Sequence, residues 1–153
     1  MAKRYFPPIS VLCEAIGTTP DALNKPGQIS VPSALLRHLI VAAISDFEID
    51  GEVYKEQNPD IAKAFANRSP NDAVTHYKTV GYFEPRPLPI KFDADYYKRR
   101  YPDIDKAVRA KALASPLQQF NATGVYELRS PRADIESTVA EWRHILAASR
   151  KRV

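Results

Sequence analysis

Cysteine, histidine and glycine are scarce in this sequence, and their scarcity excludes several kinds of site. The chain of 153 residues has one cysteine, Cys13, so an intramolecular disulfide framework is excluded and the thiol is interpreted as a small core residue. The three histidines, His38, His76 and His144, have no metal-ligand spacing among themselves or to Cys13. With five glycines, the chain has no glycine-rich phosphate loop. We therefore expect no enzymatic activity, no metal and no cofactor.

Long apolar runs are also missing. No run approaches the roughly 20 residues of a membrane-spanning helix, and the most apolar stretch, Ala34 to Ile44, contains Arg37 and His38. We interpret this stretch as a buried helix. The apolar segment near the N-terminus is too short for a cleavable secretion signal, so we expect synthesis in the cytoplasm. Later association with a surface or a particle remains compatible with the sequence.

The overall composition is that of one ordinary folded domain. Apolar residues make up 44% of the chain and charged residues 26%, which is typical of globular rather than disordered proteins. The length favours one domain over two. The net charge of +4 permits an anionic partner without requiring one. The basic residues cluster only in Tyr96–Tyr101 and in Ser149–Val153.

Proline, by contrast, is abundant, and its positions predict helices. The chain has thirteen prolines, and proline is favoured at the first position of a helix, where its missing N–H is not needed. Four prolines directly follow a hydroxyl residue suited to cap a helix, in Thr19-Pro20, Ser69-Pro70, Ser115-Pro116 and Ser130-Pro131. Asn58-Pro59 and Tyr101-Pro102 are each followed by Asp-Ile. These marks predict an all-α protein.

The chain also repeats itself at an offset of 43 residues. Residues that match between the two copies include the following pairs: Tyr54 and Tyr97, Lys55 and Lys98, Pro59 and Pro102, Asp60 and Asp103, Ile61 and Ile104, Gly81 and Gly124, Glu84 and Glu127, Arg86 and Arg129. A period of this length is typical of stacked helical units.

Each copy is predicted to form three short helices. In the second copy, Asp93 is expected to cap a helix ending near Arg100, and Pro102 and Pro116 to begin the next two. Gly81 and Gly124 are expected to end the third helix of each copy in a left-handed conformation. The predicted single domain spans residues 1–153, with an N-terminal helical cap at 1–46, repeat 1 at 47–89, repeat 2 at 90–131 and a C-terminal helix at 132–153.

The flanking segments are predicted to cover the open ends of the two stacked repeats. An apolar helix is expected from Ser33 or Val31 to about Ser45, and an amphipathic helix from Pro131 to about Arg150. Two repeats are few for an independent solenoid, which is why we expect helices at both ends. Trp142 is interpreted as the anchor of the last helix or, alternatively, as part of an oligomer contact.

The repeated pattern of Tyr, Asn/Tyr-Pro-Asp-Ile, His-Tyr, Gly and Glu-x-Arg-x-Pro resembles a short bacterial repeat. That repeat is attached to some glycosyltransferases and polysaccharide-biosynthesis proteins and to some secreted RTX-type surface proteins. The resemblance covers about Asp50 to Pro87 and Asp93 to Pro131. Two departures are Pro85 and Leu128, where the resembled repeat has glycine between Glu and Arg. The resemblance implies a non-catalytic module linked to surface polysaccharide.

The recurring Glu and Arg after each glycine are the first candidate site. A carbohydrate could contact these charged pairs and the rings beside them. The other interpretation is structural, with Arg bonding helix-end carbonyls and Glu as its ion-pair partner, and recurrence in both copies favours it. The candidate residues are Glu84, Arg86, Glu127 and Arg129, with Tyr82, Phe83 and Tyr126.

The start of repeat 2 contains further candidates. Tyr97 and Tyr101 could stack a sugar or a base, with Lys98, Arg99 and Arg100 available to a phosphate, although a tyrosine shared by both copies favours a core role. Asp93-x-Asp95 has the form of a metal-binding Asp-x-Asp, but helix capping explains it equally.

Three hypotheses follow from the sequence. The first is a non-catalytic binding or adaptor module associated with bacterial surface polysaccharide, whose partner is the polysaccharide or a protein of the machinery that makes it. The second is a basic helical nucleic-acid binder that uses Tyr96–Tyr101 and the C-terminal tail. The third is a purely structural subunit of a homo-oligomer.

Overall fold

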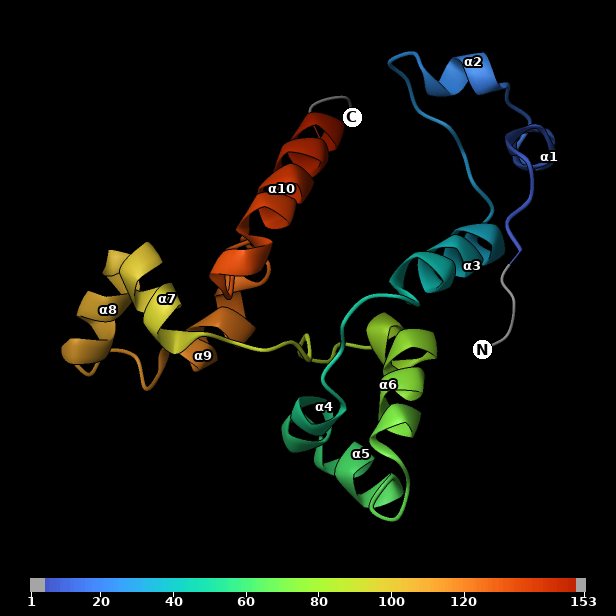
Figure 1. Ribbon diagram of the computed structural model, residues 1–153. Coiled ribbons are helices and arrows are strands. Elements are labelled where there is room, and N and C mark those ends of the chain that lie inside the picture. The colour runs from blue at the N-terminus through green and yellow to red at the C-terminus, as the bar shows by residue number, and fades with distance from the viewer. Residues whose placement is uncertain (1–4, 151–153) are drawn as a thin grey trace. The chain divides into compact units, whose positions relative to one another are not determined.

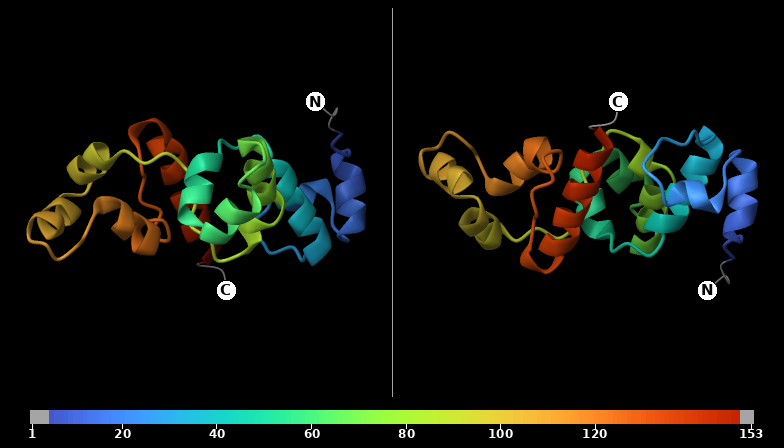
Figure 2. Two further views of the ribbon diagram at one scale, coloured as in Figure 1. Left: turned by 90° about the horizontal axis from the view of Figure 1, so that it is seen from below. Right: turned by 90° about the horizontal axis from the view of Figure 1, so that it is seen from above.

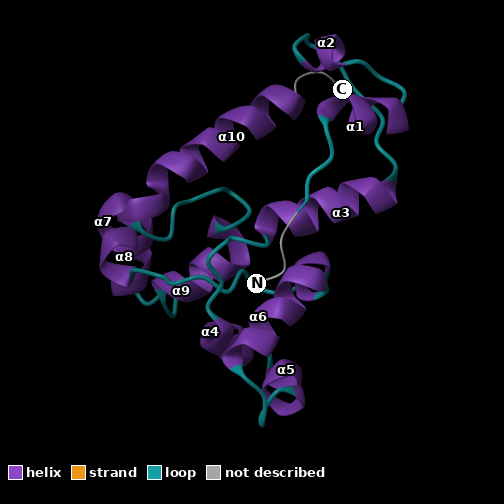
Figure 3. Ribbon diagram, turned by 45° about the vertical axis from the view of Figure 1, so that its right-hand side comes forward, coloured by secondary structure: helices purple, strands orange, loops and turns teal. Residues whose placement is uncertain are grey.

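All regular secondary structure over residues 5–150, which are the residues that this computed structural model describes, is helical (Figures 1 and 3). The described residues contain no strand, which confirms the predicted all-α class. Lys151 and Arg152 of the predicted basic tail lie outside the described residues. The helices are α1 (Ile9–Ala15), α2 (Pro20–Leu23), α3 (Ser33–Ile44), α4 (Gly51–Gln57), α5 (Pro59–Ala64), α6 (Pro70–Thr79), α7 (Ala94–Arg100), α8 (Pro102–Arg109), α9 (Pro116–Gln119) and α10 (Glu136–Arg150).

Three shorter helical turns complete the described secondary structure. Two are 3₁₀ turns, η1 (Gly81–Phe83) and η3 (Ala133–Ile135), and η2 (Phe120–Gly124) is a π-helix that directly continues α9. None of the helices in the described part of the chain is long and apolar enough to cross a membrane. The chain divides into two compact units, Met1–Asp46 and Phe47–Val153. Their border coincides with the predicted border between the N-terminal segment and repeat 1, whereas the prediction of a single domain stays a prediction.

The first unit contains α1, α2 and α3. Cys13 on α1 is buried, as expected for a small core residue. The prediction of a buried helix at Ala34–Ile44 is wrong for this structure: α3 forms over nearly the predicted range, but none of its residues is buried, and Leu36 is 47% exposed. Apolar composition therefore predicted the helix correctly but not its burial. The predicted covering of repeat 1 by this segment stays a prediction.

The second unit contains the two predicted repeats, and their first helices correspond residue for residue. Adding 43 to the bounds of α4 (Gly51–Gln57) gives those of α7 (Ala94–Arg100). Asp50 caps α4 by accepting hydrogen bonds from the N–H groups of Glu52 and Val53, and Asp93 caps α7 through the N–H of Tyr96. The second helices, α5 and α8, begin at equivalent prolines, Pro59 and Pro102, which lack the donor that a first-turn position does not need.

The third helices differ between the repeats. Ser69 caps α6 and Ser115 caps α9, both followed by proline at the first helical position. Pro116 lies three residues later than the position equivalent to Pro70, and the shorter α9 continues into the π-helix η2, where the N–H of Val125 bonds to the carbonyl of Phe120. The π-turn brings Gly124 to the position that Gly81 has in repeat 1.

Both glycines lie against a buried tyrosine. A Cβ on Gly81 would lie 2.3 Å from the hydroxyl of Tyr54, and a Cβ on Gly124 would lie 2.2 Å from the hydroxyl of Tyr97. The prediction of left-handed C-caps at these glycines is wrong. Among the described residues, positive φ occurs at Gly17, Lys111 and Leu128. The glycines are needed for close approach and not for backbone conformation.

The two tyrosines are fully buried and make equivalent polar contacts. The Tyr54 hydroxyl lies 3.1 Å from Nδ1 of His76, and the Tyr97 hydroxyl donates to Oε1 of Gln119 at 2.6 Å. His76 and Gln119 are also 43 residues apart. Burial of a hydroxyl is costly without such a partner, so the two different side chains serve the same purpose.

One small apolar cluster forms around each tyrosine. Tyr54 packs with Ile61, Ala73 and Tyr77, and Tyr97 packs with Ile90, Ile104 and Phe120. Two partly buried residues, Ile49 and Leu88, pack against both clusters. The repeats therefore share apolar contacts through the segments that precede α4 and follow η1.

The connection from repeat 1 to repeat 2 is extended between η1 and α7 (Figure 2). Its Pro89 is fully buried, and the carbonyl of Pro89 accepts a hydrogen bond of 2.9 Å from the N–H of Asp50. After repeat 2, the buried Pro131 does the same for the N–H of Asp93 at 3.1 Å. Each repeat is thus closed by a proline carbonyl bonded to the residue that caps its first helix.

The C-terminal helix begins later than predicted. Pro131 does not begin a helix, because it lies in the closing segment of repeat 2, and the hydroxyl of Ser130 donates to the carbonyl of Arg132 instead of capping. The turn η3 and then α10 follow, and Ile135 packs against the repeat 2 cluster. Covering of the open end of repeat 2 by this helix stays a prediction.

The glycine–tyrosine contact predicts a specific loss of stability. Gly81→Ala and Gly124→Ala should each lower the free energy of unfolding by about 1–3 kcal/mol, because the added methyl group overlaps a tyrosine hydroxyl that cannot move. Urea unfolding followed by circular dichroism measures the change. Gly27→Ala is the control, because a Cβ there meets nothing within 4 Å and its φ is not positive. Equal stability of all three variants would contradict the contact.

Candidate functional site

The recurring arginines are held in a network of ion pairs that is the same in both repeats. Nε of Arg86 donates to Oε2 of Glu84 at 2.5 Å, while its two terminal nitrogens donate to the two carboxylate oxygens of Asp60 at 3.1 and 2.8 Å. Such a two-point contact fixes both planar groups. Asp60 is the second residue of α5, so Arg86 ties the loop after η1 to the beginning of α5. We call this arrangement the arginine clamp.

The clamp of repeat 2 uses the equivalent residues. Arg129 donates through Nε to Glu127 at 2.6 Å and through a terminal nitrogen to Asp103 at 3.1 Å. Its guanidinium also lies over the ring of Tyr101, 4.9 Å from the ring centre. In repeat 1 the position of Tyr101 is taken by Asn58, whose side-chain oxygen accepts from Arg86 at 3.0 Å. The partner differs, but the arginine occupies the same place.

These contacts support the structural interpretation of the Glu and Arg pairs. The side chain of Arg86 is 18% exposed and that of Arg129 is 23% exposed, and each bonds to two carboxylates of its own repeat. The hydrogen bonds from Arg86 lower the pKa of Asp60 below its ordinary value of 3.8. A ligand would have to compete with these contacts. A carbohydrate-facing role for Glu84, Arg86, Glu127 and Arg129 stays an untested prediction.

Of the two interpretations of Tyr97, ligand stacking and a core role, its burial supports the core role that recurrence in both copies favoured. The residue is fully buried, and burial raises the pKa of its hydroxyl to about 12. Tyr101 is half-buried, with the guanidinium groups of Arg129 and Arg100 near its ring. Its hydroxyl accepts a hydrogen bond of 2.7 Å from the N–H of Ser130. These rings are not presented to a sugar or a base.

The remaining aromatic candidates are more exposed but do not gather into one site. Tyr82 is 45% exposed, and its ring contacts Tyr77 and Phe83 edge-on. Tyr126, which corresponds to Phe83 of repeat 1, is 76% exposed. The sequence reasoning therefore identified exposed rings here, but the structure does not bring them together with the clamps in a cavity.

The Asp-x-Asp sequence is explained by helix capping and a local ion pair. Asp93 caps α7, and Asp95 pairs with Lys98 at 3.0 Å. In repeat 1, Asp50 caps α4 and Glu52 pairs with Lys55 at 2.8 Å. Within residues 5–150, no group of three or more His, Cys, Asp or Glu side chains is arranged to hold a metal ion.

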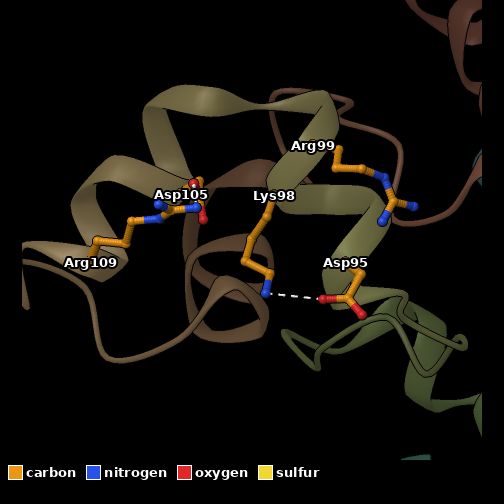
Figure 4. A pocket seen from close by; sticks show the side chains of 5 residues that line it. All are labelled: Asp95, Lys98, Arg99, Asp105 and Arg109. Carbon is orange, nitrogen blue, oxygen red and sulfur yellow. Dashed lines mark ion pairs between the residues drawn. The ribbon is translucent and has the colours of Figure 1, made fainter.

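A hollow of about 180 Å³ lies on repeat 2 between α7 and α8 (Figure 4). Arg109 lies beside Asp105 at one end, Lys98 reaches Asp95 from the middle, and Arg99 lies above Asp95 with its guanidinium directed away from the other side chains. Arg109 pairs with Asp105 at 2.8 Å, and the side chain of Asp105 is the most buried carboxylate of the site at 25% exposure. The hydrogen bond from Lys98, together with the charge of Arg99, lowers the pKa of Asp95. The lining residues are Asp95, Lys98, Arg99, Asp105 and Arg109.

Comparison of the two repeats shows which lining residues of the hollow recur in repeat 1 and which do not. Lys98 and Asp95 correspond to Lys55 and Glu52, so their ion pair belongs to the common repeat. The other three lining residues have no charge-equivalent counterpart: Arg99, Asp105 and Arg109 correspond to Glu56, Ala62 and Ala66. Repeat 1 folds without them, so the pattern common to both repeats does not require them.

Sequence reasoning found Lys98 and Arg99 but missed Asp105 and Arg109. Both lie on α8 at a spacing of four residues, one turn apart. A comparison of the two copies position by position for charge, and not only for identity, would have found them. Arg100, which the sequence grouped with Lys98 and Arg99, instead bonds to Glu136 at 2.5 Å.

Compared with protein-family models, with curated proteins and with solved structures, the chain has no significant match. The site is therefore interpreted from its own geometry.

The arginine clamp predicts a dependence of stability on pH. Because the folded-state pKa of Asp60 lies below its ordinary value of 3.8, the contribution of the ion pair is complete above that pH and is lost as the pH falls through the folded-state pKa. Asp60→Asn should lower the unfolding free energy at neutral pH and flatten its decrease in acid. Urea unfolding at a series of pH values measures both effects.

The control for this experiment is Asp72→Asn, in the first turn of α6, which forms no ion pair with another described residue. It should leave the acid dependence unchanged. An acid dependence that Asp60→Asn does not alter would show that the clamp contributes nothing to stability.

Proposed function

We propose that the protein is a non-catalytic binding module that holds an acidic saccharide in the hollow between α7 and α8. The observation that carries this proposal is the set of charged residues that only repeat 2 has: Arg99, Asp105 and Arg109. Since the common repeat does not require them, we interpret their presence around one hollow as a ligand site. The arginine clamps and the buried tyrosines, which both repeats share, form the scaffold that supports the hollow.

The mixture of charges favours a sugar acid over a nucleic acid. Lys98, Arg99 and Arg109 supply donors for carboxylate groups, and Asp95 and Asp105 supply acceptors for hydroxyl groups. A nucleic-acid backbone carries a negative charge about every 1.7 Å along a duplex, which is denser than one carboxylate per sugar, so the two aspartates oppose it more strongly. The rings that could stack a base, Tyr97 and Tyr101, are buried or covered.

The volume of the hollow suits one sugar residue of a polysaccharide chain. Its volume of about 180 Å³ is below the range of about 300–1,000 Å³ that is typical of pockets for drug-sized ligands. One sugar residue is therefore the natural occupant. The resemblance of the repeats to a module of polysaccharide-biosynthesis and surface proteins supports a bacterial surface polysaccharide as the source. An adaptor role in its synthesis, or a place on a cell surface or particle, belongs to the same proposal.

The chain itself offers the substitutions that test this proposal. Arg99→Glu with Arg109→Ala gives repeat 2 the residues that repeat 1 has at these positions, and so should leave the fold intact. Polygalacturonate, a polymer of sugar acids, is the probe, with neutral dextran for comparison, and calorimetry measures binding. The double variant should bind polygalacturonate at least about tenfold more weakly, a change of about 1.4 kcal/mol.

The matched control carries the same change in charge on repeat 1. Arg68→Glu with Lys63→Ala alters two exposed cations away from the hollow and should retain the affinity. An equal loss in both variants would mean a non-specific charge effect and would contradict the site. Absence of polygalacturonate binding, or tighter binding of duplex DNA than of polygalacturonate, would overturn the proposal, and the second result would favour the nucleic-acid hypothesis.

A further inference from the structure

Arg99 is the lining residue of the hollow that forms no ion pair within residues 5–150. Lys98 pairs with Asp95 at 3.0 Å, and Arg109 pairs with Asp105 at 2.8 Å. In each of these pairs the two charges balance one another. The three cations and two carboxylates of the lining therefore leave one positive charge, and Arg99 carries it. A ligand that enters the hollow meets one cation whose charge is not already balanced.

The neighbours of Arg99 on α7 explain why it stays unpaired. Asp95 lies four residues before Arg99, a spacing that permits an ion pair on a helix, but its carboxylate is engaged by Lys98. Arg100, the next residue along the chain, is bonded to Glu136 at 2.5 Å. Arg99 itself is exposed, and Figure 4 shows its guanidinium directed away from the other lining side chains. Its donors are therefore open to solvent beside the hollow.

The positive charge at this position belongs to repeat 2 alone. Repeat 1 has Glu56 in place of Arg99, whereas the ion pair next to it recurs as Glu52 with Lys55 at 2.8 Å. The recurring pair is part of the common repeat, and Arg99 is not. A partner that binds the Arg99 guanidinium has no internal ion pair to displace, unlike a partner of either arginine clamp.

We propose that Arg99 binds the carboxylate of the sugar next to the one held in the hollow, so that the site recognises two consecutive sugar acids. The hollow of about 180 Å³ suits one sugar residue, and the guanidinium of Arg99 points away from the side chains that would surround it. In a polymer of sugar acids, the next sugar carries a carboxylate of its own, which a guanidinium can bind through two parallel N–H groups. This inference rests on the proposed function.

The second contact makes the affinity depend on the length of the saccharide. Once one sugar occupies the hollow, the carboxylate of the next sugar is held close to Arg99, so the second contact forms within the complex and not from free solution. An exposed ion pair that must form from free solution contributes little. A disaccharide of sugar acids should therefore bind clearly more tightly than the single sugar acid.

Calorimetry with galacturonate and digalacturonate, on the full chain, tests this inference. Digalacturonate should bind the unaltered protein at least about tenfold more tightly than galacturonate, and about twofold of this gain comes from having two sugars that can enter the hollow. Arg99→Gln should reduce the ratio of the two affinities to about twofold. Arg99→Lys should retain part of the gain, because lysine keeps the charge but not the planar pair of donors.

Two further variants distinguish the contact of Arg99 from a general effect of charge. Arg109→Ala should weaken the binding of both saccharides by a similar factor and leave their ratio high, because Arg109 lies beside Asp105 in the hollow. Arg68→Gln removes an exposed cation from repeat 1 and should leave both affinities as they are. Circular dichroism checks that every variant is folded.

The outcomes separate this inference from the proposed function. A ratio of about twofold in the unaltered protein, or a high ratio that Arg99→Gln leaves in place, would overturn the inference alone, since the hollow would still bind sugar acids. An equal loss of affinity for both saccharides in Arg99→Gln would also overturn it, because Arg99 would then contact the sugar in the hollow. If neither saccharide nor polygalacturonate binds, the proposed function fails and the inference fails with it.

Discussion

The approach of a glycine backbone to a buried tyrosine hydroxyl is the contact on which each repeat depends. Because Gly81 and Gly124 have no Cβ, the end of the third helix can reach Tyr54 or Tyr97, and the hydroxyl can bond to His76 or Gln119. The chain then turns, and five residues after the glycine an arginine reaches the beginning of the second helix. In both repeats, the same residues at the same spacing along the sequence therefore make the same contacts.

Comparison of the two repeats shows which residues recur with the fold and which differ between the copies. Positions that recur carry the buried tyrosine, the close glycine, the cap and the arginine clamp, and all of them have structural contacts. Positions that differ, such as Glu56 and Arg99 or Ala66 and Arg109, are not constrained by the repeat. The hollow between α7 and α8 is built from both kinds, with the recurring Lys98 and Asp95 beside three residues found only in repeat 2. A common scaffold thus carries a feature that one copy alone possesses.

Local signals were sufficient to predict the first two helices of each repeat, because capping aspartates and first-position prolines act within one turn. The bounds of α4 and α7 follow from Asp50 and Asp93 in this way. Long-range effects were not predictable: nothing local shows that Gly81 faces Tyr54, that a π-turn compensates for the late start of α9, or that Pro131 closes repeat 2. The site was predicted only in part, since Lys98 and Arg99 were visible as a basic cluster, whereas the contribution of α8 depends on packing.

The central claim is that two copies of one three-helix scaffold fold alike. Native-state hydrogen exchange tests it most directly, because it reads the stability of each copy at matched backbone amides. The N–H groups of Tyr54 and Tyr97, each bonded at 2.9 Å to the residue that caps its helix, and those of Asp50 and Asp93, each bonded to a closing proline, should all be protected. Protection in one repeat with exchange at the rate of an unfolded chain in the other would contradict the account.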